Sequence, residues 1–170
     1  MVYGGSLRTW IGAAALLAMA SPSPAFAQDS ASVTGLADIA FGTIASPTDQ
    51  SNSQNVSICS YGSFFRIPLY AINYSVVATG SGSGGAFTLS SGVATLAYDV
   101  QWADATDATS GTMLQPGVAS SGFGNNANSL LCRRGPQDNA SLIVTIRAAE
   151  LATATAGTYS GTLQITISPD

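Results

Sequence analysis

The chain has 170 residues, of which 46% are hydrophobic and only 8% are charged. It contains no histidine and no lysine, and its five basic residues stand against nine acidic ones, for a formal net charge of −4. The composition excludes histidine-based catalytic triads, histidine-containing zinc sites, Schiff-base chemistry and the lysine of phosphate-binding loops. It therefore disfavours most classes of enzyme, and so acidic a chain offers no basic surface for nucleic acid.

The first 27 residues have the pattern of a secretory signal peptide. Arg8 precedes an apolar run at 10–20 that is too short to span a bilayer. Ala25-Phe26-Ala27 then has the small-x-small form that signal peptidase accepts. We expect cleavage before Gln28, which leaves a mature domain of residues 28–170 without a transmembrane segment; an uncleaved membrane anchor is the alternative.

Export would place Cys59 and Cys132 in an oxidising compartment. Two cysteines in such a chain are most simply explained as one disulfide. A redox pair more often has the C-x-x-C spacing, and a thiolate metal site needs more ligands. We therefore expect a Cys59–Cys132 disulfide that joins distant parts of the chain, and neither a metal nor a cofactor.

Apolar and polar residues alternate along the mature chain as they do in β-strands. The alternation predicts two strands near the C-terminus, with Leu142, Val144 and Ile146 on one face of the first and Leu163, Ile165 and Ile167 on one face of the second. Further strands are predicted at 56–59, 74–78, 86–89 and 93–102, and one helical turn at 148–152. Short strands with Gly, Ser, Asn and Pro clusters between them are typical of an all-β sandwich.

Short pieces of sequence occur along the mature chain in a particular order. They are Phe41-Gly42-Thr43, Ile58-Cys59-Ser60-Tyr61, Ala78-Thr79-Gly80-Ser81-Gly82, Leu96-Ala97-Tyr98-Asp99-Val100-Gln101-Trp102, Cys132 followed by Asn139-Ala140, and Ala156-Gly157-Thr158-Tyr159-Ser160-Gly161-Thr162-Leu163. In this order they resemble the spore coat protein U domain, a family similar to the subunits of archaic chaperone-usher pili. The resemblance covers nearly all of the mature chain, and its last piece is the most specific.

The resemblance implies an immunoglobulin-like sandwich that lacks its last strand and is completed by a donor strand from another chain. It implies a non-enzymatic subunit of a pilus (fimbria) or surface coat, structural or adhesive in role. Such a subunit is exported through the periplasm to the cell surface, with a periplasmic chaperone, an outer-membrane usher and neighbouring subunits as partners. The expected donor-strand groove is lined by Leu142, Val144, Ile146, Leu163, Ile165 and Ile167.

The position of the last predicted strand gives separate support for an incomplete sandwich. It ends at Ile167, close to the C-terminus, so the sequence offers no further strand to pair beside it. An unpaired apolar edge promotes aggregation unless it is covered, and strand addition by a partner covers it. One alternative is a self-contained coat protein whose edge is covered by its own N-terminus. A secreted carbohydrate-binding or hydrolytic sandwich is the other.

The N-terminal stretch 28–40 departs from the pattern of a polymerising pilin. Such a pilin needs a free donor segment followed by its own first strand, whereas this stretch has alternation for one strand only, at Ala31, Val33, Gly35, Ala37 and Ile39. The cysteine that many relatives carry in this region is also absent. We therefore expect a tip or terminal subunit that accepts a donor strand without donating one, or a coat protein outside a fibre.

Other candidate sites have less specific patterns. Asp99, Asp104 and Asp107 have oxygen ligands suited to Ca²⁺, but not the spacing of an EF-hand, and a solvated loop is favoured. The same residues with Glu150 form no recognisable glycosidase pair. The stretch 80–85 contains G-x-G-x-x-G, but a strand rather than a helix follows, so it is interpreted as a hairpin loop.

The apolar segment 64–70 has two open interpretations. It is either a strand that packs into the core, with Pro68 favouring an edge position, or an exposed loop that contacts a surface or partner. The residues that would make such a contact are Phe64, Phe65, Ile67, Leu69 and Tyr70.

Overall fold

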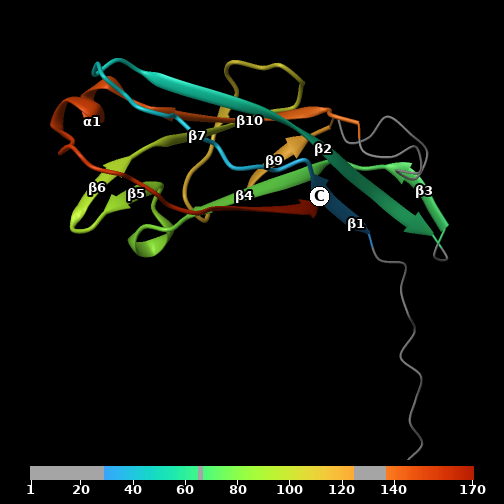
Figure 1. Cartoon of the computed structure of the whole chain (residues 1–170). Helices are drawn as coiled ribbons and strands as arrows, with labels where there is room; N and C mark the ends of the chain where they lie inside the picture. Colours follow the sequence, from blue (N-terminus) through green and yellow to red (C-terminus); the bar gives the residue numbers. More distant parts are fainter. Residues whose placement is uncertain (1–28, 65–66, 125–136) are drawn as a thin grey trace, which may run out of the picture.

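The computed structural model describes residues 29–64, 67–124 and 137–170. Within them, two layers of antiparallel β-sheet face each other, and helix is limited to two short segments (Figure 1). The prediction of an all-β sandwich is therefore confirmed. The predicted signal peptide, residues 1–27, lies outside the described residues.

Among the described residues, the first layer has six strands in the order β1-β2-β10-β7-β8, with β3 also paired to β2. β2 is long enough to change partners along its length, because β10 pairs with 50–56, β1 with 57–61 and β3 with 61–64. The strands are β1 (Ser30–Thr34), β2 (Gln50–Phe64), β3 (Ile67–Ala71), β7 (Asp99–Ala103), β8 (Thr112–Met113) and β10 (Ala140–Ile146).

In the described ranges, the second layer has three strands in the order β11-β4-β9. They are β4 (Tyr74–Gly80), β9 (Ser120–Phe123) and β11 (Leu163–Pro169). A small hairpin of β5 (Thr88–Ser91) and β6 (Ala94–Ala97) lies at one end of the sandwich (Figure 1). A short 3-10 turn (Ser83–Gly85) precedes this hairpin, and a short helix, α1 (Ala148–Thr153), follows β10.

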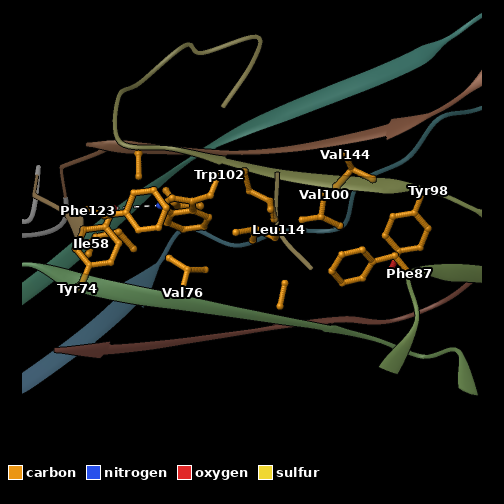
Figure 2. Packing of buried hydrophobic residues seen from close by; sticks show 14 of the residues in the cluster. Ile58, Tyr74, Val76, Phe87, Tyr98, Val100, Trp102, Leu114, Phe123 and Val144 are labelled. Atoms are coloured by element: carbon orange, nitrogen blue, oxygen red, sulfur yellow. Dashed lines mark hydrogen bonds between the residues drawn. The ribbon is translucent and has the colours of Figure 1, made fainter. Parts of the chain in front are cut away.

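The core lies between the two layers (Figure 2). Tyr74, Trp102, Ile58 and Phe123 gather at one end of it, and Phe87 stacks on Tyr98 at the other, with ring centroids 5.7 Å apart. Burying each large side chain of this kind contributes roughly 1.5–3 kcal/mol. The face predicted for β10 is correct, since Leu142, Val144 and Ile146 all belong to the core cluster.

The single strand predicted at 93–102 is wrong, because the chain divides there into β6 and β7, which belong to different sheets. The break falls at Tyr98, whose backbone N–H donates to the carbonyl of Phe87 at 3.0 Å. That bond and the stacking of the two rings fix Tyr98 at the end of the hairpin, and the chain turns from there into the first layer.

Other boundaries also differ from the sequence prediction. β2 extends well beyond 56–59, since its polar first half is held by the ladder with β10. The strand predicted at 86–89 is shifted to β5. The stretch 80–85 joins β4 to β5, which do not pair with each other, so it is not a hairpin loop. The helical turn is confirmed at α1, whose first N–H, on Ala148, donates to the Asp49 carboxylate at 2.7 Å.

Candidate functional site

β11 is the candidate functional element because it is an edge strand. One of its edges pairs with β4 along its whole length, from Leu163 opposite Gly80 to Pro169 opposite Tyr74. Within the described ranges, no strand pairs with the other edge. An edge strand presents a row of unpaired backbone N–H and C=O groups, which is a template for another strand.

The side chains of β11 show that the core is also open along this edge. Leu163, Ile165 and Ile167 pack against the core cluster but stay half-buried, while the residues between them are exposed. On the neighbouring β4, the inward residues Tyr74 and Val76 are fully buried. Among the described strands, β4 is paired on both sides, whereas β11 is paired with β4 alone, although β1 lies close to it.

The structure separates the six residues predicted to line a donor-strand groove. Leu142, Val144 and Ile146 lie in β10, in the interior of the first layer, with exposures of 2%, 6% and 1%. They belong to the enclosed core, because β10 is flanked by β2 and β7. Only the three residues of β11 lie at an open edge.

Residues 36–44, which follow β1, lie next to the core, and the sequence did not predict this. The alternation in 31–39 suggested one strand through Ile39, but β1 ends at Thr34 and Gly35, with φ +90°, turns the chain. We call residues 36–44 the strap. It runs back along β2 between the two layers (Figure 1), with Ile39, Phe41 and Ile44 half-buried against the core.

Two polar side chains of β2 hold the strap. The Gln54 side-chain oxygen accepts a hydrogen bond from the backbone N–H of Ala37 at 3.0 Å, and the Asn52 amide donates to the carbonyl of Ala40 at 3.2 Å. The sequence signal for these residues was available but was missed. They continue the inward alternation of Val56 and Ile58 toward the start of β2.

The carboxylates considered for Ca²⁺ or glycosidase chemistry have separate partners. Asp99 pairs with Arg147, Asp104 accepts hydrogen bonds from the Tyr74 hydroxyl and the Gly124 N–H, and Asp107 accepts one from Asn55. Among the described residues, no group of three or more metal-binding side chains occurs. These acids, and Glu150 on α1, are therefore not gathered into a site.

The apolar segment 64–70 is described only in part. Residues 67–71 form β3, which pairs with the far end of β2, as expected of an edge strand containing Pro68. Residues 65 and 66 lie outside the described residues, and the contact role of Phe64, Phe65, Ile67, Leu69 and Tyr70 stays a prediction.

Cys59 is disulfide-bonded in the structure. Cys132 lies outside the described residues, so its pairing with Cys59 stays a prediction. We expect mass spectrometry of the alkylated, unreduced protein to find no free thiol. Recovery of a chain with both cysteines alkylated would contradict the pairing.

The fold and the edge strand β11 together define an all-β sandwich of two antiparallel layers. A solved structure described as "Chaperone-tip adhesin complex is vital for synergistic activation of CFA/I fimbriae biogenesis" is similar to this chain, with a TM-score of 0.50 and 18% sequence identity. The similarity covers 84% of this chain but only 41% of that one, so this chain spans less than half of its neighbour's length. At this identity the likeness is one of fold alone.

No protein-family model matches the chain, and a search of curated proteins found no match. Membership of the spore coat protein U family therefore stays a prediction. In the described part of the chain, no helix is long and apolar enough to cross a membrane.

Proposed function

We propose that this protein is an exported, non-enzymatic subunit of a fimbria or surface coat, and that the free edge of β11 accepts a strand from another chain. The observation that carries the proposal is the coincidence of two features on one strand. No strand in the described part of the chain pairs with the outer backbone edge of β11, and its inward side chains Leu163, Ile165 and Ile167 are only half-buried.

An added strand would satisfy both features. Its backbone would pair with the free edge, and its alternate side chains would cover the three half-buried residues of β11. Each large apolar side chain that becomes fully buried contributes roughly 1.5–3 kcal/mol. A ligand that binds only the folded domain also raises the apparent stability of that domain.

The pairing of β1 supports a subunit that accepts a strand without donating one. β1 is engaged with β2 of its own chain, from Ser30 opposite Tyr61 to Thr34 opposite Ser57. Ala31 and Val33 are therefore held within the domain and are not free to complete a neighbour. This favours a tip or terminal position over a place in a fibre shaft.

The partners in this proposal are a periplasmic chaperone, which covers the β11 edge during transit, an outer-membrane usher and a neighbouring subunit. The fimbrial structure described above was solved as a complex of a chaperone with a tip adhesin, and its fold resemblance supports the first of these partners. An edge with half-buried aliphatic side chains needs such cover during export, because it would otherwise pair with other exposed strands.

A melting experiment with a synthetic peptide tests the proposal. We expect a peptide in which valine alternates with threonine to raise the melting temperature of the exported protein in a concentration-dependent way. The same peptide with aspartate at the valine positions should have no effect, because charged side chains cannot enter the core without a large desolvation cost.

Two substitutions in β11 serve as the variant and its matched control. Ile165→Asp should abolish the peptide's effect and also destabilise the domain, since Ile165 faces inward. Thr166→Asp places the same charge on the exposed side of the same strand, and its peptide response should stay close to that of the wild type. A wild-type domain that melts cooperatively as a monomer and ignores the peptide would refute strand acceptance.

A self-contained coat protein is the second candidate, and the strap favours it. Ile39, Phe41 and Ile44 cover part of the core from within the chain, as a self-completed sandwich requires. The negative outcome of the peptide experiment would select this candidate.

A further inference from the structure

Asn52 and Gln54 face the inside of the sandwich. In the antiparallel ladder they lie opposite Val144 and Leu142, and opposed residues share a face of the sheet. Both partners belong to the core, as does Val56, the next inward residue of β2. Asn52 is exposed and Gln54 is half-buried, so both lie at the margin of the core, and each side chain has a hydrogen-bond partner in the chain. Here those partners are backbone groups of the strap.

The strap has the side-chain pattern of a strand but not its pairing. Ile39 and Phe41 are half-buried, and Asp38, Ala40 and Gly42 are exposed. In the portion of the chain that the structure describes, no backbone group of the strap bonds to another backbone group. Besides its apolar contacts, the strap is held by the bonds to Gln54 and Asn52.

The strap lies where the two layers come apart (Figure 1). At one end of the sandwich, β1 and the end of β2 lie beside β11, so the two layers are close to each other there (Figure 1). The strap leaves β1 at Gly35 and continues between the layers along the first half of β2, where its three apolar side chains pack against the core.

We infer that the strap is a releasable cover for the open side of the sandwich, and that Asn52 and Gln54 are the clamp that holds it. This inference rests on the proposed function. It adds that the strap protects the core before the donor strand of another chain binds. Neutral hydrogen bonds of this kind are individually weak. The strap can therefore release while the β2–β10 and β4–β11 ladders stay intact.

The test compares the double variant Asn52→Ala/Gln54→Ala with Ser53→Ala. Ser53 lies between the clamp residues on β2, is exposed and faces away from the core. In the free exported protein, we expect the double variant to bind a hydrophobic dye such as anilinonaphthalene sulfonate several-fold more strongly than wild type. Ser53→Ala should not differ from wild type. Equal dye binding by the two variants would overturn the inference.

Peptide kinetics provide the second measurement, with the valine-threonine peptide as the probe. Freeing the strap should raise the association rate about tenfold, since two weak bonds no longer have to break first, and should leave the dissociation rate unchanged. Faster dissociation with unchanged association would mean that the strap is a fixed wall of the site, which overturns the inference.

The two proposals fail in different ways. If the wild type does not bind the peptide, strand acceptance fails, while dye binding still decides whether the strap is a cover. If the peptide binds and both variants behave alike, only the releasable cover fails. Circular dichroism confirms that the variants fold, and should the double variant not fold, Gln54→Ala alone is measured in the same way and must increase dye binding.

Discussion

Replacement of Asn139 by alanine is expected to lower the free energy of unfolding by about 3 kcal/mol. Asn139 is 5% exposed, and its side-chain amide bonds to the backbone of Ile58, which pairs with β1 but lies beyond the end of the β10–β2 ladder. Its Nδ2 donates to the Ile58 carbonyl at 2.8 Å, and its Oδ1 accepts from the Ile58 N–H at 2.7 Å. The β10–β2 ladder ends with Ala140 opposite Val56. The Asn139 amide therefore continues the ladder by one more pair of hydrogen bonds, made by a side chain.

The large effect follows from what the substitution leaves behind. Ile58 is 1% exposed, so water cannot replace the lost amide without opening the core. Two buried backbone groups would lose their partners, and each costs about 1–3 kcal/mol. Urea denaturation measures the change. The neighbouring exposed Asp138→Ala is the control and should stay within about 0.5 kcal/mol of wild type; an equally small change for Asn139→Ala would show that this pairing contributes little.

Tyr74→Phe is expected to cost about 2 kcal/mol, because it removes one hydroxyl from a buried chain of hydrogen bonds. The Trp102 Nε1–H donates to the Tyr74 hydroxyl at 3.1 Å, and that hydroxyl donates to the Asp104 carboxylate at 2.9 Å. Trp102 is fully buried, so its indole N–H would have no acceptor in the variant. Tyr159→Phe is the matched control, since Tyr159 is half-buried and its hydroxyl bonds to the nearby Thr155 carbonyl; a similar cost for both variants would contradict the role of burial.

The same hydroxyl should make stability fall at alkaline pH. Burial, together with the hydrogen bond to Asp104 and its charge, raises the pKa of Tyr74 above the ordinary value of 10.0, and the Trp102 hydrogen bond opposes this only in part. Above pH 10 the tyrosine ionises in the unfolded state while the folded state keeps it neutral. The stabilisation is therefore complete below about pH 10 and is lost as the pH rises further. In Tyr74→Phe this contribution should disappear, so its stability should decline less steeply above pH 10 in urea titrations.

The sequence predicts those strands in which apolar and polar residues alternate along the strand itself. β10 and β11 follow directly from apolar residues at every second position, because side chains of a strand point alternately to its two faces. The break between β6 and β7 could not be found this way. The run through Tyr98 alternates without interruption, and it is the contact of that residue with Phe87 that ends the strand.

Alternation along the sequence also predicts only part of the candidate site. Period-two alternation identifies the inward face of β11, but it does not tell an edge strand from an interior one, so Leu142, Val144 and Ile146 were placed with it. Asn52 and Gln54 were missed because polar residues before Val56 suggest a loop. Their strand conformation is supplied by the ladder with β10, and their partners come from the strap.

The edge strands β8, β9 and β11 differ as templates for an added strand. In the described part of the chain, β8 is only two residues long, and the pairing of β9 with β4 is interrupted by a register shift between Tyr74 and Val76. Short or irregular strands are poor templates for further pairing. β11, by contrast, runs in register with β4 over seven residues. Strand addition through this edge therefore has one polarity, and growth by that route would proceed from a single side of each molecule.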